Sequence, residues 1–155
     1  MIFEDSFVVR APIGTVWAFL RDPERVARCI PGAEKVDVID DRTYHVVAGA
    51  RVSFLSVSFD LRVVLTEVDE PRRLVSRAEG MDPRLKERLR LTSALDLEAA
   101  GPADTTVRYH IDVQVYGKLA SIGFTVIKGK ARQMATEFAQ SVRTTLEAPE
   151  QGGQP

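Results

Sequence analysis

Cysteine and histidine are scarce in this chain of 155 residues, which has one cysteine, Cys29, and two histidines, His45 and His110. A single cysteine excludes an intramolecular disulfide and any zinc or iron–sulfur site that needs several cysteines. It also makes a reducing compartment the default expectation. Because the sequence has no carboxylate–histidine spacing typical of metal ligands, we predict no metal site.

Long apolar runs and an excess of one charge are also missing. A membrane-spanning helix needs about 20 consecutive apolar residues, and the sequence contains no such run. The first residues, MIFED, lack the basic and apolar regions of a signal peptide. The 21 basic and 22 acidic residues give a formal net charge of -1, which excludes a general attraction to nucleic acid. We expect a cytoplasmic protein, with the inner face of the cell membrane as an open alternative.

What is present is the composition of one globular domain. Hydrophobic residues make up 45% of the chain and charged residues 28%, the balance of a soluble protein with a core of its own. The length suits a single domain. We predict that this domain covers residues 1–147 and that residues 148–155 form a disordered polar tail.

Proline and glycine mark the first elements. Residues 2–10 alternate as a strand does, and Pro12 and Pro23 suit the first turns of two short helices. Asp22 is a plausible cap of the second helix. The pair Pro31-Gly32 ends this helical segment in a turn. The sequence therefore predicts a strand followed directly by two short helices.

Residues 33–115 alternate with a period of two, which predicts about six further strands. Such alternation is typical of an antiparallel sheet with one wet face and one covered face. It places Tyr44 and Tyr109 on the covered face and His110 on the wet face, as a surface histidine. Four acids fall on turns or wet faces, so the pattern predicts no buried acid for acid–base catalysis. These acids are Asp82, Glu87, Asp96 and Glu98.

A helical period from about residue 118 to 146 predicts one long helix that covers the sheet. Its apolar stripe contains Leu119, Gly123, Val126, Ile127, Met134, Phe138 and Val142. Ser121 and Gly123 beside a helix start could suggest anion binding, but we favour a close packing contact. One helix, roughly 10 Å wide, cannot fill a large twisted sheet, which predicts an apolar cavity between them. Lys130 shares the stripe, and its ammonium group either reaches the cavity mouth or meets a ligand atom or an acidic partner.

Two parts of the sequence resemble known families. Residues 7–12 (FVVRAP) and 16–20 (VWAFL) resemble the first strand and helix of the START-like, or SRPBCC, helix-grip superfamily. This superfamily includes birch-pollen-allergen-like proteins and polyketide cyclases. Residues 22–34 (DPERVARCIPGAE), 59–61, 67–71 and 117–123 resemble the carbon monoxide dehydrogenase CoxG family. The resemblance covers about residues 3–146.

The resemblance implies an α+β helix-grip fold, with a curved antiparallel sheet wrapped around the C-terminal helix. It also implies a non-catalytic accessory protein of a molybdenum-containing carbon monoxide dehydrogenase or related hydroxylase. Such a protein would carry a quinone- or lipid-like ligand, with no covalently bound cofactor, and aid membrane recruitment or delivery of the electron acceptor. Some relatives have a longer C-terminal extension, so the short polar tail here puts tail-mediated anchoring in doubt.

We predict a ligand site on the covered face of the sheet and the facing stripe of the helix. Its residues are Tyr44, Phe59, Leu61, Leu91, Leu95, Tyr109, Ile111, Val126, Lys130, Met134 and Phe138. The tyrosine hydroxyls could bind a carbonyl-bearing ligand, or they could be core groups satisfied by the backbone. Met134 and Phe138 suit an isoprenoid or aromatic ring, and equally an ordinary core.

Two other functions stay open at this point. One is a cyclase- or hydrolase-type enzyme of the same superfamily, and the other is an assembly factor with a filled core and no ligand. Two basic patches could approach acidic lipids or partners, or could simply be solvated faces. The patches are Arg84, Lys86, Arg88 and Arg90 in one case, and Lys128, Lys130 and Arg132 in the other.

Overall fold

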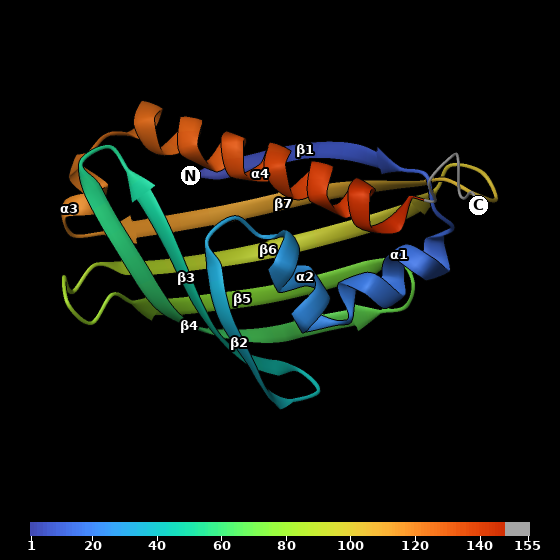
Figure 1. The fold of residues 1–155 in the computed structure, drawn as a ribbon, viewed down its shortest axis with the longest axis horizontal. Coiled ribbons are helices and arrows are strands. Elements are labelled where there is room, and N and C mark those ends of the chain that lie inside the picture. The colour runs from blue at the N-terminus through green and yellow to red at the C-terminus, as the bar shows by residue number, and fades with distance from the viewer. Residues whose placement is uncertain (148–155) are drawn as a thin grey trace.

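The computed structural model describes residues 1–147, and Figure 1 shows how they fold. The first strand and the two short helices are β1 (Ile2–Val9), α1 (Ile13–Leu20) and α2 (Pro23–Cys29). Six further strands follow: β2 (Ala33–Asp40), β3 (Thr43–Val52), β4 (Leu55–Asp69), β5 (Arg73–Met81), β6 (Arg88–Ala99) and β7 (Thr105–Tyr116). The chain continues through α3 (Lys118–Ser121) and α4 (Phe124–Leu146). The predicted polar tail, residues 148–155, lies outside the described residues.

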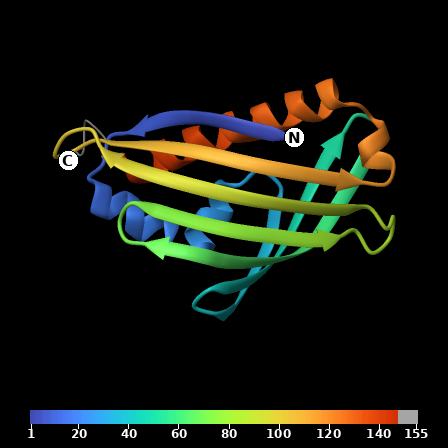
Figure 2. The same cartoon turned by 180° about the vertical axis from the view of Figure 1, so that it is seen from behind.

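The seven strands form one antiparallel sheet in the order β1-β7-β6-β5-β4-β3-β2. Each strand from β2 to β7 pairs with its neighbour in the sequence, and β1 returns to pair with β7, so that Phe7 lies opposite Val107. The helices lie over one face, and within the described residues the other face carries none (Figures 1 and 2). The predicted α+β helix-grip architecture is confirmed.

The two short helices form where the prolines predicted them. Asp22 caps α2, because its side chain accepts a hydrogen bond from the backbone N–H of Arg25 at 3.3 Å, and Pro23 is the first helical residue. Pro12 occupies the cap position of α1 in an extended conformation. Both helices pack their apolar residues against one end of the sheet, including Phe19, which is fully buried.

The prediction of one continuous helix from 118 to 146 is wrong, because the chain breaks between α3 and α4. Gly123 has a φ of 113°, a region that L side chains rarely adopt, so the helix cannot continue through it. A Cβ atom at Gly123 would meet no heavy atom within 4 Å. The interpretation of Gly123 as a packing contact is therefore wrong as well, and its role is to turn the backbone.

Buried apolar side chains form two separate clusters rather than one. The first core lies under α1, α2 and the end of α4, and contains Val9, Ala11, Val16, Trp17, Phe19, Cys29, Leu65, Leu74, Leu97, Val107 and Val142. The second core lies around the β3–β4 turn and the start of α4, and contains Val52, Leu55, Val57, Phe59, Leu61, Leu119 and Ile127. The covered face between these cores is where the candidate site lies.

Candidate functional site

Helix α4 crosses the open side of the curved sheet (Figure 1). Its closest backbone neighbours are α2 and two strands near opposite edges of the sheet, β1 and β3. The central strands are not among these neighbours, so the helix meets them mainly through side chains. How completely those side chains fill it decides whether a ligand can enter.

Midway along α4, the side chains facing the covered side are only half-buried. Leu91 of β6, Tyr109 and Ile111 of β7, and Lys130 and Met134 of α4 all retain solvent exposure. We call these five residues the middle zone. Its apolar members belong to neither core. Because these side chains face a helix and still meet solvent, α4 does not seal the sheet here. An apolar ligand would need such an unsealed region to enter a site under the helix.

Five other predicted residues lie at the ends of the middle zone. Phe59 and Leu61 are buried in the second core. Tyr44, Leu95 and Phe138 are partly buried and pack against the first core. The ring of Phe138 meets that of Phe7 edge to face, with centroids 6.4 Å apart. These side chains bound the zone and fix its length.

Val126 is the predicted site residue that the structure contradicts, since its side chain is 44% exposed. The break at Gly123 starts a new helix whose buried face contains Ile127, Ala139 and Val142. Val126 precedes Ile127 by one residue, which rotates it about 100° away from the sheet. It therefore cannot contribute to a site under the helix.

The two tyrosines offer free hydroxyl groups. Burial raises the pKa of Tyr44 and of Tyr109, so both stay neutral donors at ordinary pH. Within residues 1–147, neither hydroxyl has a hydrogen-bond partner. Neither hydroxyl oxygen is fully buried, so both remain accessible. The interpretation as core tyrosines satisfied by the backbone therefore fails for the described chain, and both groups can donate to another molecule.

Lys130 brings a positive charge to the same region. Its side chain is half-buried, and the ion pairs formed within residues 1–147 do not include it. Of the alternatives that the sequence left open, an acidic partner therefore has no support in the described part of the chain. An ammonium group at the mouth of the zone, or one in contact with a polar ligand atom, agrees with this position.

A family model for CoxG, a subunit of carbon monoxide dehydrogenase, matches residues 6–147. The chain belongs to this family. No curated protein matches the chain closely enough to count as a relative.

Solved structures similar to this CoxG-family chain share its fold. A conserved protein from Geobacillus kaustophilus has a TM-score of 0.86 at 19% identity, covering 94% of this chain and 95% of that one. A START superfamily protein from Mycobacterium smegmatis has a TM-score of 0.72 at 12% identity, with 94% and 97% covered. The Zhui aromatase/cyclase from Streptomyces sp. R1128 also scores 0.72, at 16% identity, with 99% and 96% covered. At these identities the likeness establishes the START-like fold.

The prediction that no acid is buried is wrong for this CoxG-family chain. Asp82 is 0% exposed, and it accepts hydrogen bonds from the backbone N–H groups of Ser58 and Arg84 at 2.8 Å and of Leu85 at 3.2 Å. Burial alone would raise its pKa, but these bonds and the Arg84 guanidinium outweigh burial and lower the pKa to about 2. A carboxylate held ionised in this way organises a turn and cannot serve as a general acid.

Glu87 is the second buried acid, and it also has a structural role. One carboxylate oxygen accepts the backbone N–H of Leu119 at 2.6 Å, at the start of α3. Asp82 and Glu87 both lie between β5 and β6, away from the middle zone. The pair Asp82-Pro83 is a typical turn sequence and was the available signal for this arrangement. Neither acid supports the enzyme alternative.

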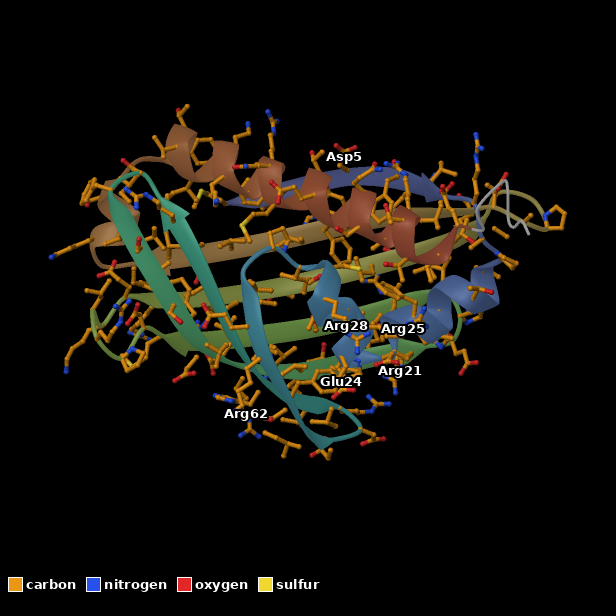
Figure 3. All side chains as sticks on the ribbon, in the orientation of Figure 1. Asp5, Arg21, Glu24, Arg25, Arg28 and Arg62 are labelled. Atoms are coloured by element: carbon orange, nitrogen blue, oxygen red, sulfur yellow. The ribbon has the colours of Figure 1, made fainter. Side chains whose placement is uncertain are left out.

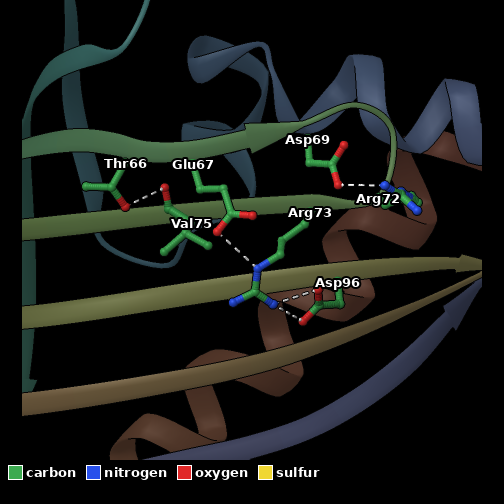
Figure 4. Close-up of polar contacts among 7 residues, drawn as sticks. All are labelled: Thr66, Glu67, Asp69, Arg72, Arg73, Val75 and Asp96. Atoms are coloured by element: carbon green, nitrogen blue, oxygen red, sulfur yellow. Dashed lines mark hydrogen bonds and ion pairs between the residues drawn. The ribbon is translucent and has the colours of Figure 1, made fainter.

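The outer face of the sheet is a solvated surface of ion pairs. Arg73 contacts both carboxylate oxygens of Asp96 at 2.8 and 2.9 Å and Glu67 at 3.4 Å, and Arg72 contacts Asp69 at 2.9 Å (Figure 4). Such exposed pairs contribute little to stability. Among the residues that the structure describes, this face contains nothing that resembles a catalytic arrangement.

Each histidine also lies beside a carboxylate. His110 lies 2.7 Å from a carboxylate oxygen of Glu4 and is exposed, which confirms the predicted surface histidine, and His45 lies 3.7 Å from Asp60. Within residues 1–147, no three His, Cys, Asp or Glu side chains gather as metal ligands would.

Two surface hollows are lined largely by charged residues. One, of about 460 Å³, is lined by Glu4, Asp5, Ser6, Asp96, Arg108, Tyr109 and His110. The other, of about 240 Å³, is lined by Glu24, Ala27, Arg28, Ala33, Glu34, Lys35 and Val36. Neither is the apolar cavity predicted under the helix, so support for that cavity rests on the half-buried middle zone.

Arg21 is not among the predicted site residues. Its Nη1 atom is buried and has no hydrogen-bond partner within the described residues. Figure 3 places Arg21 near Arg25 and Arg28, along the two short helices. Its charge acts on Tyr44, where it opposes the rise in pKa that burial causes. Because a buried donor normally has a partner, Arg21 is a further candidate contact for a polar ligand atom, and nothing in the sequence period marks it.

Proposed function

We propose that this CoxG-family chain is a non-catalytic carrier of an apolar ligand, quinone- or lipid-like. The observation that carries the proposal is the middle zone, where apolar side chains under α4 stay half-buried between two closed cores. Removing apolar surface of a ligand from water gains roughly 25 cal/mol per Å². The free hydroxyl of Tyr109 and the ammonium group of Lys130 would then hold a carbonyl-bearing head group.

The family supplies the proposed partner. Membership in the carbon monoxide dehydrogenase CoxG family supports association with a molybdenum-containing carbon monoxide dehydrogenase or a related hydroxylase. In that setting a quinone carrier would deliver the electron acceptor, and we propose peripheral membrane contact because quinones dissolve in bilayers. Within residues 1–147, no helix combines the length and apolar content that crossing a bilayer requires.

Two experiments test the carrier function. Protein purified without detergent should release an isoprenoid quinone or lipid on organic extraction, which mass spectrometry identifies. Calorimetric titration with decylubiquinone should show saturable binding. A preparation free of ligand that also gives no heat with quinones would contradict the proposal and favour an assembly factor with no ligand.

A variant that fills the middle zone makes the titration specific. Met134→Trp places a large ring in the half-buried zone, and we expect it to weaken decylubiquinone binding by about tenfold or more. Thr136→Trp is the matched control, since Thr136 is exposed on the same helix. Equal binding by both variants would place the ligand elsewhere on the molecule.

A further inference from the structure

One end of the molecule exposes large apolar side chains that contribute little to either core. Phe54 is 75% exposed at the β3–β4 turn, and Phe124 is 54% exposed at the start of α4. Leu85 and Tyr116 are also exposed. We call residues 51–55, 81–88 and 116–128 the tip.

The three segments of the tip are adjacent in space. Val52, Leu119 and Ile127 belong to one cluster, the second core, which lies directly beneath the exposed residues. The Leu119 N–H bond to Glu87 joins the β5–β6 turn to α3. Figures 1 and 2 both show the β3–β4 turn, α3 and the start of α4 together at this end.

The charge of the tip differs from that of the whole chain. The tip contains six basic residues, Arg51, Arg84, Lys86, Arg88, Lys118 and Lys128, against two acids. Both acids, Asp82 and Glu87, are buried, so the exposed charge is positive although the chain as a whole has a formal net charge of -1. The basic side chains also lie beside the exposed rings, with Arg88 5.1 Å from the centroid of Tyr116 and Lys128 5.4 Å from that of Phe124.

The backbone of the tip is held in a defined shape. Ser53 has a φ of 57°, a turn conformation that sets Phe54 at the end of its hairpin. The buried carboxylate of Asp82 binds three backbone N–H groups, one of them from β4. Exposed phenyl rings gathered at one end of the molecule, beside basic side chains, indicate a contact with another surface.

We propose that the tip docks on the surface of an anionic phospholipid bilayer. Phe54 and Phe124 would enter the interfacial layer, where aromatic rings are favoured, while the basic side chains face the acidic headgroups. The chain offers an internal contrast at the end of β2, where Val38 and Ile39 are also exposed but are flanked by Asp37, Asp40 and Asp41. The inference rests on the proposed function only for its purpose, the loading or release of a membrane-soluble ligand.

Vesicle co-sedimentation of the full chain tests this surface. We expect binding to vesicles of equal parts phosphatidylglycerol and phosphatidylcholine, weaker binding at higher salt, and little binding to phosphatidylcholine alone. The double variant Phe54→Ser/Phe124→Ser should lower the partition coefficient by about tenfold or more. The double variant Lys86→Glu/Lys128→Glu should also lower the partition coefficient, because it replaces two positive charges of the tip with negative ones.

The matched control is Val38→Ser/Ile39→Ser, which removes as many exposed apolar side chains and should leave binding unchanged. Thermal unfolding verifies that each variant is folded. A wild-type chain that ignores anionic vesicles, or a tip variant that binds them as well as wild type, overturns the proposal. Loss of partner-enzyme capture by the tip variants without any vesicle binding would make the tip a protein interface and also overturn it.

Calorimetry without vesicles separates this inference from the carrier function. Tip variants that bind decylubiquinone normally but not vesicles support the docking surface. Vesicle binding by a chain that binds no quinone contradicts only the carrier function.

Discussion

Asp82 is the clearest case of a residue whose role is set by its hydrogen bonds. It is fully buried, yet three backbone N–H groups and one guanidinium keep it ionised, with a pKa lowered to about 2. The alternating sequence pattern could not predict the burial of Asp82, because alternation describes strands and Asp82 lies in a turn. Its burial follows from turn geometry, for which Asp-Pro was the only local signal.

The lowered pKa gives Asp82 a defined effect on stability. Asp82→Asn should lower the free energy of unfolding by about 1–3 kcal/mol at pH 7, measured by urea denaturation. Because the folded pKa lies below the unfolded value, this contribution is present above about pH 4 and is lost as the pH falls toward 2. The difference between the two proteins should therefore shrink across that range. A difference that stays constant from pH 7 to pH 2, or an equal loss in the exposed control Glu137→Gln, would contradict this role.

At the scale of elements, the sequence predicted the strands and short helices well and the C-terminal helix less well. Alternation is a direct consequence of one covered face, so the six strands and the facing of Tyr109 and His110 could be predicted. The break between α3 and α4 could not, because the apolar period continues on both sides of Gly123. That break also explains why Val126 was assigned to the wrong face.

Substitution of Gly117, just before α3, and of Gly129, inside α4, should change the stability in opposite directions. Gly117 has a φ of 79°, and a Cβ atom there would lie 2.6 Å from a carboxylate oxygen of Glu87. Gly117→Ala should therefore destabilise the protein. Gly129 lies inside α4 with nothing within 4 Å of an added Cβ atom, so Gly129→Ala should stabilise it by up to about 1 kcal/mol. Urea denaturation measures both, and effects of the same sign would contradict this account of the helix.

For the molecule as a whole, the main feature is a helix that contacts both sides of a curved sheet and leaves the centre half-covered. The sequence predicted which residues share the covered face, since period and face are linked. It could not predict how burial varies along that face. Leu91 and Leu97 lie on the same side of β6, but only Leu97 is buried, because α1 and α2 cover that end. The burial of a side chain on the sheet depends on which helix lies above its position, and this is set by the tertiary structure.

If the chain is a carrier, an apolar ligand enters the middle zone under α4. Methyl-detected NMR during a titration with decylubiquinone tests it most directly. We expect the methyl signals of Leu91, Ile111 and Met134 to shift together and saturate, while those of Val16 and Val142 in the first core stay in place. Signals of the middle zone that do not move while the ligand is bound, or the absence of any binding, would contradict it.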